Sequence, residues 1–432
     1  MRYRLRDIPD VLRTPPGREH FRNGFYYRAW PLLRSLATMH RATFARRTKV
    51  VAVVGSLGKT TTTRTVRAVL EGDFSFLTPK NAYNFLAISL LKTRPRDPYA
   101  VLEVGIARQG EMAGYARMIR PDIAVVTSIA SEHNRSLGTL ETTREEKAEM
   151  VRVLPPSGVA VLNGDDPRVL WMAGQTKARV LTFGLGADND VRAEGVELDW
   201  PHGTRFTLHA AGRTRPIRIR LIGQHMVYPA LAAVAVALVE GRELDSAISA
   251  LEQVPPTPMR LQPVLLTSRA YLLRDEFKSP LETVHAALDV LAQIPARRRF
   301  VVLGEISEAQ GDRGSLYRDI GARVAASATK AYFFSTQFQR LSSGAHRAGM
   351  PRDALVNTHF DLRVAIDALL GDLGQGDVVL VKGRKSQRLE RISLALSGRQ
   401  VRCRVKQCDA LLTQCDDCAM LERGWEGRRF VI

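Results

Sequence analysis

A short apolar run, a glycine turn, a lysine and four threonines follow one another in residues 50–63, Val-Val-Ala-Val-Val-Gly-Ser-Leu-Gly-Lys-Thr-Thr-Thr-Thr. The run predicts a buried strand that leads into a turn and then into a helix beginning near Lys59. Backbone N–H groups of the turn and the positive end of the helix dipole would face anionic oxygens. We therefore predict a phosphate-binding loop made of Gly55, Ser56, Leu57 and Gly58.

The side chains after this loop suit a nucleoside triphosphate and its metal ion. Lys59 would neutralise the β- and γ-phosphates, and the Thr60 hydroxyl would bind Mg²⁺. Only two residues separate the glycines, whereas the common pattern has four, so this is a variant loop. A strand-to-helix turn with a solvated lysine is the alternative, and the apolar run before the turn favours the phosphate loop.

Three further residues are candidates for the same site. Glu103 ends a second apolar run, so its carboxylate is expected at the sheet edge where α/β proteins bind ligands, as a second ligand for Mg²⁺. His133 follows a third run and would reach the same edge. Lys147 lies among acidic residues in a predicted helix over 143–150. Taken singly, His133 also fits a surface or capping histidine and Lys147 an ion-pair partner on a helix.

All four cysteines fall in the last 30 residues, with the spacing C-x4-C-x6-C-x2-C. Four thiolates this close suit one structural Zn²⁺ ion, and C-x2-C is a common half-site. Free thiols on a helical tail and a redox or iron–sulfur role are the alternatives. The zinc ligands would be Cys403, Cys408, Cys415 and Cys418.

The segments that must position these residues alternate between short β-branched runs and longer helical stretches, which predicts a mostly parallel sheet covered by helices. A proline-rich stretch before Met259 marks a boundary, after which the alternation restarts with a strand over 299–304 and a helix from about residue 313. We predict four parts: a basic helical leader (1–48), a central domain (49–256), a second α/β domain (257–396) and a cysteine-containing tail (397–432). The predicted strands are 49–54, 99–104, 122–128, 157–162, 299–304, 330–335 and 377–382.

Composition sets outer limits on the function. A chain of 432 residues is expected to form two or three domains, and 45% hydrophobic with 25% charged residues is ordinary for a soluble protein. No apolar run approaches the roughly 20 residues of a membrane-spanning helix, and the N-terminus does not read as a secretory signal. We expect a cytoplasmic protein without a membrane span.

The net charge of +19 is distributed unevenly, because residues 1–49 hold 12 Lys and Arg against 3 Asp and Glu. Such a leader would attract a polyanion: nucleic acid, an anionic membrane face, an acidic carrier or partner protein, or a phosphorylated substrate. A solvated arginine-rich surface is the alternative. The interspersed aromatic residues fit a helix face packed on the body at least as well as base stacking.

Together the motifs resemble those of the Mur ligase family, the ATP-dependent amide ligases of peptidoglycan precursor synthesis, and most closely its D-alanyl-D-alanine-adding branch. The resemblance covers about residues 48–395 and implies a central phosphate-loop ATPase domain followed by a Rossmann-like α/β domain. Its motifs are Gly55-x-x-Gly58-Lys59-Thr60-Thr61, Asn81-Ala-Tyr-Asn84, Leu-Glu103-Val-Gly, Arg120-Pro-Asp-Ile-Ala, Glu146-Lys147-x-Glu149, Gly223-x-His225, Met259-Arg260-Leu, Val302-Leu-Gly304-Glu305 and Val381-Lys382-Gly383.

The resemblance implies a reaction in which ATP phosphorylates a carboxylate and an amine attacks the resulting acyl phosphate. It places Lys59 and Thr60 on the phosphates and a first Mg²⁺, with Glu103 completing that ion's ligands. His133 and a carbamylated Lys147 would hold a second Mg²⁺, because a carbamate offers the anionic oxygen that Mg²⁺ prefers. Further nucleotide-binding positions carried over from the family are Thr61, Asn84, His225, Arg260 and Asp275, of which Arg260 would neutralise the transferred phosphoryl group.

The sequence also departs from the family pattern. Only the basic leader precedes the phosphate loop, where the family has a domain that binds UDP. Met226 and Pro229 replace asparagines near the adenine, and residues 276–279, Glu-Phe-Lys-Ser, replace the Tyr-Asn-Ala-Asn segment of the closest branch. The tail with its cysteines has no counterpart in the family pattern.

Our leading hypothesis is therefore an ATP- and Mg²⁺-dependent ligase that joins an amino acid, small peptide or other amine to a carboxylate outside the standard UDP-linked route. A cell-wall UDP-muramoyl-peptide ligase with a compacted acceptor site is the first alternative. A non-catalytic nucleotide-binding subunit of a partner protein is the second. The hypothesis of a nucleic-acid-dependent ATPase is supported only by the positive net charge and is the least favoured.

Overall fold

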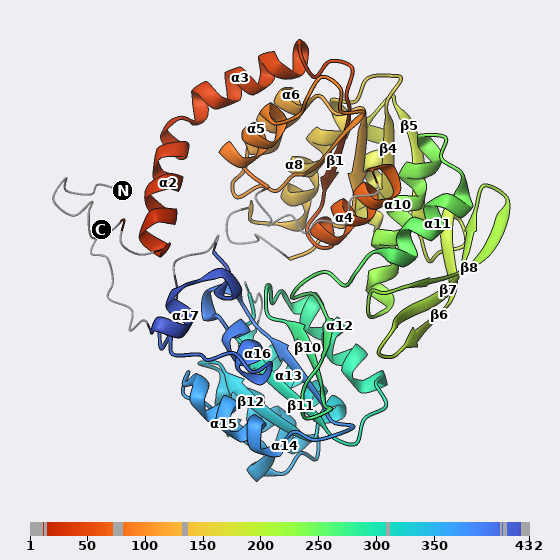
Figure 1. Ribbon diagram of the computed structural model, residues 1–432. Helices are drawn as coiled ribbons and strands as arrows, with labels where there is room; N and C mark the ends of the chain where they lie inside the picture. The colour runs from red at the N-terminus through yellow and green to blue at the C-terminus, as the bar shows by residue number, and fades with distance from the viewer. Residues whose placement is uncertain are drawn as a thin grey trace. The chain divides into compact units, whose positions relative to one another are not determined.

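The computed structural model describes residues 12, 15–71, 81–131, 137–307, 312–406, 408 and 413–424. They form two compact units, each with its own sheet (Figure 1). One unit comprises residues 26–255. The other comprises residues 256–432 together with the segment up to Phe25. Each unit is a mixed α/β structure, so the predicted fold class is confirmed.

The first unit is built on an eight-stranded sheet of order β2-β1-β3-β4-β5-β6-β7-β8, parallel from β2 to β6 and antiparallel from β6 to β8. Its strands are β1 (Lys49–Val54), β2 (Tyr99–Glu103), β3 (Ile123–Val126), β4 (Val159–Asn163), β5 (Arg179–Gly184), β6 (Val191–Asp199), β7 (Gly203–Ala210) and β8 (Arg213–Ile219). Its helices are α3 (Trp30–Ala42), α4 (Lys59–Glu71), α5 (Asn84–Leu91), α6 (Glu111–Ile119), α8 (Leu140–Arg152), α9 (Pro167–Leu170), α10 (Val227–Val239) and α11 (Leu244–Gln253), with short 3-10 turns η2 (Trp171–Gln175) and η3 (Gln224–Met226). The helix before them, α2 (Pro15–Arg28), passes from one unit into the other.

Helices cover both faces of this sheet because alternate residues of a strand point to opposite faces. Val51 and Val53 of β1 belong to a core shared with α4, α10 and α11. Val50, Ala52 and Val54 belong to a second core shared with α3, α5, α6 and α8. A parallel strand buried on both sides is almost wholly apolar, which explains why β1 was recognisable in the sequence.

The predicted strands of this unit are confirmed to within three residues at either end, and the predicted helix over 143–150 lies inside α8. Strand β5, which is parallel to β4, and the antiparallel strands β6, β7 and β8 were missed. β8 is exposed or half-buried over its first four residues, alternates between buried and exposed positions over its last three, and holds three arginines and a proline, so it lacks a continuous apolar run. The search for buried runs therefore passed over it.

The second unit is built on a six-stranded sheet of order β13-β12-β11-β14-β10-β9, parallel except at β9. Its strands are β9 (Gln262–Leu265), β10 (Tyr271–Asp275), β11 (Arg299–Gly304), β12 (Lys330–Phe334), β13 (Leu355–Asn357) and β14 (Val378–Lys382). Its helices are α12 (Leu281–Gln293), α13 (Arg313–Ser327), α14 (Phe338–Arg347), α15 (Leu362–Asp372), α16 (Glu390–Leu396) and α17 (Met420–Arg423), with 3-10 turns η4 (Arg352–Ala354), η5 (Lys385–Gln387) and η6 (Cys415–Asp417).

One face of this second sheet packs on α15 and α16 through a core that includes Leu272, Val302, Val381 and Ile366. The predicted strands 299–304, 330–335 and 377–382 correspond to β11, β12 and β14. The carboxyl ends of β10 and β14 lie side by side, since Asp275 is in register with Lys382. This edge carries the polar residues of the second unit considered below.

Candidate active site

The predicted phosphate loop follows β1 and adopts a backbone that demands glycine. Gly55 has φ +142°, and a Cβ built on it would lie 1.9 Å from Thr127 Oγ1. Gly58 has φ +81°. The Ser56 amide donates to the Ser128 carbonyl at 2.7 Å, and the Thr127 hydroxyl donates to the Leu57 carbonyl at 2.6 Å. The end of β3 therefore holds the loop tightly against the sheet.

Gly55→Ala is expected to destabilise the first unit by about 1–3 kcal/mol and to weaken nucleotide binding at least about tenfold, because the loop must shift away from Thr127. Urea unfolding and ATP titration calorimetry measure the two effects. Gly174→Ala is the matched control, since a Cβ there meets nothing within 4 Å. Equal behaviour of the two variants would contradict a close-packed loop.

Two lysines meet at this loop. Lys59 Nζ donates to the carbonyls of Gly55 and Ser56, each at 2.8 Å, and only 5% of its surface is exposed. Lys147 Nζ, from α8, donates to Ser56 Oγ at 2.7 Å and is 2% exposed. The structure thus brings together two predicted site residues that are 88 positions apart in the chain.

Burial holds the pKa of Lys147 well below its ordinary value, because the charged form loses its hydration. The nearby Lys59 charge lowers this pKa further, and the Asp166 carboxylate opposes the shift. An amine with a lowered pKa is more available in its uncharged, nucleophilic form. Bound phosphate would offer Lys59 the anionic partner that the loop carbonyls supply only in part.

Glu103 ends β2, beside Val53 of β1, so its carboxylate lies at the same sheet edge as the start of the loop. Its Oε1 accepts a hydrogen bond from Asn81 Nδ2 at 2.6 Å. Thr60, half-buried, occupies the first turn of α4, and Thr61 beside it is buried. The Thr60 hydroxyl and the Glu103 carboxylate are hard oxygen donors of the kind Mg²⁺ prefers.

Of the other predicted site residues in this unit, the structure describes Asn84 and His225. Asn84 is buried at the start of α5, and within the described residues its Nδ2 has no hydrogen-bond partner. That orphaned donor suits a bound ligand. His225 lies half-buried in η3. His133 lies outside the described residues.

Several residues that support the loop had no predicted role. The Ser128 hydroxyl accepts from the Leu57 amide at 3.1 Å, and Ser56 Oγ accepts from the Ala130 amide at 2.9 Å. Asp166 caps α9 and accepts from the Ile129 amide at 2.8 Å. Their polar types at the ends of β3 and β4 were the available signal, since parallel strands end at one edge.

The second unit holds the remaining predicted residues at the ends of β10 and β14. Lys382 Nζ pairs with Asp275 Oδ2 at 2.8 Å, and both side chains are buried. Burial raises the pKa of Asp275 and lowers that of Lys382, while their mutual attraction opposes both shifts. Arg260 adds a second positive charge near Asp275.

Two cations lie over one aromatic ring next to this pair. The Arg260 guanidinium lies 4.2 Å from the centre of the Phe277 ring, and Lys385 Nζ lies 4.5 Å from it. Burial, followed by repulsion from Arg388, lowers the pKa of Lys385 to about 8. Lys382 was known only as part of a motif, and Phe277 and Lys385 were given no role. The second unit therefore presents a positively charged edge suited to anionic groups.

The lowered pKa of Lys385 predicts a pH dependence. The unfolded chain holds this proton up to about pH 10.5, so stability is expected to rise with pH above about 8 as the folded form sheds the charge. Lys385→Met removes this contribution, about 2–3 kcal/mol at most. Urea unfolding at pH 7 and pH 9.5 measures it, with Lys177→Met as an exposed control. An identical rise in both variants would contradict the assignment.

Comparison with known proteins decides the family. The sequence pattern of the Mur ligase middle domain matches residues 53–237, and that of the Mur ligase, glutamate ligase domain matches residues 260–385. A UDP-N-acetylmuramoyl-tripeptide–D-alanyl-D-alanine ligase of Escherichia coli is 30% identical over 356 residues, which cover 81% of this chain and 76% of the relative. The chain belongs to the Mur ligase family.

Further Mur ligases give the same picture. The ligase of the same name from Mycobacterium tuberculosis is 30% identical over 370 residues, covering 80% of this chain and 72% of the relative. A crystal structure of MurF from Acinetobacter baumannii superposes with a TM-score of 0.75 at 25% identity, covering 85% of this chain and 80% of that one. The MurF ligase of Thermotoga maritima, solved in complex with ADP, has the same fold with a TM-score of 0.72.

Membership in the Mur ligases makes the chain an enzyme of the ATP-dependent, ADP-forming carboxylate–amine ligase class, as the motifs predicted. The family resemblance and its D-alanyl-D-alanine-adding branch are likewise confirmed. Mur ligases use ATP and Mg²⁺, and the residues described above fit both groups: a loop with a positive-φ glycine at each end, two buried lysines, and oxygen donors in Thr60 and Glu103. No helix in the described part of the chain is long and apolar enough to span a bilayer.

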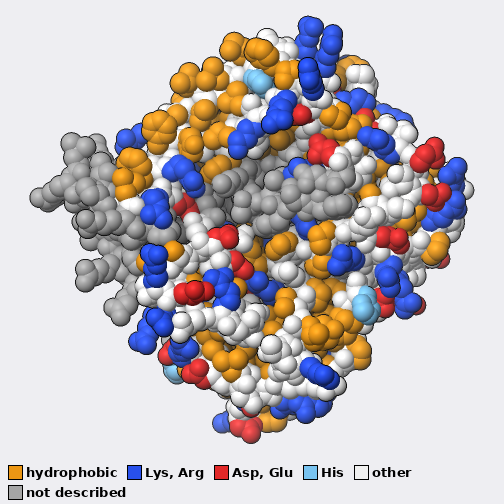
Figure 2. Space-filling model, in the orientation of Figure 1, with side chains coloured by type: hydrophobic (Ala, Val, Ile, Leu, Met, Phe, Trp, Pro, Cys, Tyr) orange, Lys and Arg blue, Asp and Glu red, His pale blue; other side chains and the backbone are white. Residues whose placement is uncertain are grey.

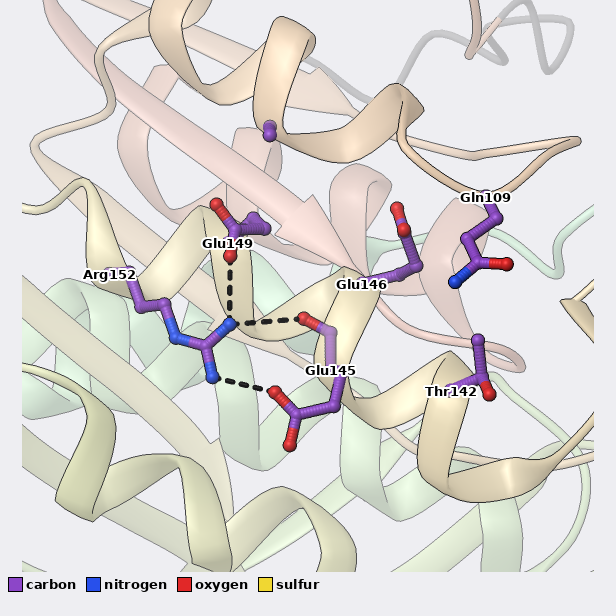
Figure 3. A pocket seen from close by; sticks show the side chains of 7 residues that line it. Gln109, Thr142, Glu145, Glu146, Glu149 and Arg152 are labelled. Atoms are coloured by element: carbon purple, nitrogen blue, oxygen red, sulfur yellow. Dashed lines mark hydrogen bonds and ion pairs between the residues drawn. The ribbon is translucent and has the colours of Figure 1, made fainter.

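A cavity of about 300 Å³ lies beside this Mur ligase site, between α8 and the start of α6 (Figure 3). Arg152 there forms ion pairs with Glu145 at 2.7 Å and Glu149 at 2.8 Å. Glu146 Oε1 accepts from the Gly110 amide at 2.6 Å, just before α6. The ion pairs are of the kind found on helix surfaces, and the bond to the Gly110 amide is of the kind that a carboxylate forms at a helix N-terminus.

The zinc prediction for the tail is not supported. All four cysteines are described and unpaired, yet within the described residues no group of three or more His, Cys, Asp or Glu side chains is arranged to hold a metal ion. Cys415 instead packs in a small apolar cluster with Leu394 and Leu421. Arg391 fixes the tail to α16 by donating to the carbonyls of Cys403 and Val405.

Proposed function

We propose that this Mur ligase joins an amine of the amino acid or short peptide kind to the carboxylate of a UDP-muramoyl peptide, with ATP converted to ADP and phosphate. The buried pair of Lys59 and Lys147 at the loop carries the ATP-dependent part of the proposal. The names of the relatives support the UDP-linked acceptor. Our expectation of a route outside UDP-linked precursors has no support from these comparisons, and neither has a partner or carrier protein at the N-terminus.

The proposed reaction has two steps. A carboxylate oxygen attacks the γ-phosphorus of ATP, the bond to the bridging oxygen breaks, and an acyl phosphate and ADP form. The amine nitrogen then attacks the acyl carbon and loses a proton, and the tetrahedral intermediate expels phosphate to leave an amide. Most of the catalysis in such phosphoryl transfer comes from positioning and charge stabilisation.

The residues have distinct proposed roles. The loop amides and Lys59 hold the β- and γ-phosphates, and Arg260 neutralises the transferred phosphoryl group. Asp275, held by Lys382, is proposed to lie near the ribose and phosphates. Asn84 and His225 are proposed contacts of the nucleotide. Thr60 and Glu103 would bind one Mg²⁺, and His133 with Lys147 a second; bound Mg²⁺ supplies positive charge to the phosphate oxygens.

Carbamylation of Lys147 is part of this proposal. The uncharged amine would attack CO₂, form a nitrogen–carbon bond and lose a proton to give an anionic carbamate. Enzyme incubated with ¹³C-bicarbonate is expected to show one carbamate carbon signal that Lys147→Arg lacks. Wild-type enzyme without that signal, or a signal that persists in Lys147→Arg, would contradict the modification.

A coupled assay tests the function. ADP release is followed with UDP-muramoyl-tripeptide and D-alanyl-D-alanine, with each substrate omitted in turn, and the product is identified by mass. Turnover that requires both substrates is the expected result. Turnover only with a carboxylate that lacks UDP would overturn the proposed acceptor, and nucleotide binding without any turnover would favour a non-catalytic subunit.

The predicted domain boundaries and a cytoplasmic location stay predictions.

A further inference from the structure

Helix α3 presents an apolar ridge to solvent on the side away from the body of the first unit. Leu32, Leu36 and Met39 recur at the i, i+4 and i+7 positions of one helix face and are 63%, 39% and 57% exposed. Phe44, just after the helix, is 63% exposed and extends the ridge. Figure 2 shows hydrophobic side chains gathered where Figure 1 places α2 and α3, with Lys and Arg side chains among them.

The opposite face of α3 is fixed to the unit, so the ridge is held in an outward position. Ala37 lies in the core with α5 and α6, and Trp30 and Leu33 pack against the same core. Arg41 is buried and donates to the carbonyls of Ile119, Ala45, Thr48 and Arg120, and it pairs with Asp122 at 3.0 Å. Turning the ridge inward would break these bonds and leave a buried guanidinium unpaired.

The stretch of chain that carries the ridge has charge of one sign. Residues 20–70 contain ten Lys and Arg and no Asp or Glu. Arg46 and Arg47 follow Phe44 after one residue and are both exposed. An exposed apolar stripe with exposed arginines at its end is typical of a helix that lies in the interface of an anionic bilayer. Positive charge on this surface also attracts the negatively charged lipid headgroups.

We propose that this face, formed by Leu32, Leu36, Met39 and Phe44 with Arg46 and Arg47, docks the enzyme on a membrane surface rich in anionic phospholipid. The apolar ridge enters the boundary between headgroups and acyl chains, and the arginines bind the phosphates. The association is peripheral and reversible, because it needs no helix that spans the bilayer. It does not depend on the identity of the ligase substrates.

Vesicle sedimentation with the full chain tests the proposal. We expect binding to vesicles of phosphatidylglycerol and phosphatidylcholine, weakened by salt, and much weaker binding to phosphatidylcholine alone. Leu32→Gln with Met39→Gln is expected to lower binding roughly tenfold or more. Arg46→Gln with Arg47→Gln is expected to lower it about 25-fold, at about fivefold for each charge.

Matched controls remove the same groups elsewhere. Leu265→Gln with Leu370→Gln replaces two leucines of similar exposure, and Arg213→Gln with Arg220→Gln removes two exposed arginines. Both are expected to bind vesicles within about twofold of the wild type. Binding unchanged by the ridge variants, or independent of lipid charge, would overturn the proposal. So would a concentration-dependent dimer, seen by light scattering, that is lost in the ridge variant while no vesicles are bound.

Discussion

Lys59→Ala is expected to lower the rate of ADP formation by about 10²–10³-fold. The Lys59 ammonium is buried and fixed to the Gly55 and Ser56 carbonyls, so it is positioned before the substrate arrives. Removing a preorganised charge from the phosphates has an effect of this size because water cannot replace it in a buried site. Steady-state assays at saturating ATP measure the loss.

The same substitution has a second expected effect. The Lys59 charge is one cause of the lowered pKa of Lys147, so its removal should raise that pKa and shift the amine toward its charged form. The ¹³C-bicarbonate signal from a carbamate should then weaken. Lys177→Ala, which removes an exposed lysine of the same unit, is the control and should keep full activity. Activity of Lys59→Ala within tenfold of the wild type would contradict the proposed role of the loop.

Lys382→Met is expected to destabilise the second unit by about 3–5 kcal/mol. It leaves the Asp275 carboxylate buried at the end of β10 without its ion-pair partner, which costs far more than the pair contributed. It also removes the bond from Lys382 to the Lys278 carbonyl. Urea unfolding followed by circular dichroism measures the loss as a lower midpoint with an unchanged slope.

Lys330→Met is the matched control for this prediction. Lys330 pairs with Asp372 at the same kind of distance, 2.9 Å, but both side chains are about one-third exposed, so a loss of only about 0–1 kcal/mol is expected. Adding Asp275→Leu to Lys382→Met should restore part of the stability, because no charge is then left buried. Equal losses for Lys382→Met and Lys330→Met would show that burial does not set the cost.

How much the sequence revealed depended on how local each signal was. The strand, turn and helix around Gly55 are contiguous, and each obeys a rule about neighbouring residues. Seven parallel strands were visible because burial makes them nearly continuously apolar, whereas the parallel strands β5, β10 and β13 were missed. Strand β8, with its arginines and exposed positions, carried no such signal.

The cysteine tail shows the opposite case. Four cysteines within 16 positions suggested one metal ion, but spacing along a chain does not fix where the thiols point. Burial of Cys415 against Leu394 and Leu421 gave that thiol a packing role. Arg391, which holds the tail, gave no hint of this role in the sequence, because its acceptors are backbone carbonyls that every residue has.

The amino-acid sequence by itself determined the phosphate loop, the alternation of strands and helices, and the ligase family, because these depend on residues close together or on motifs in a fixed order. Only the tertiary structure decided that Lys147 donates a hydrogen bond to Ser56, that Lys382 forms an ion pair with Asp275, and that α3 exposes an apolar ridge to solvent. Each of these contacts joins segments whose separation in the chain says nothing about their distance in space. Packing of the helices on the two sheets sets that distance.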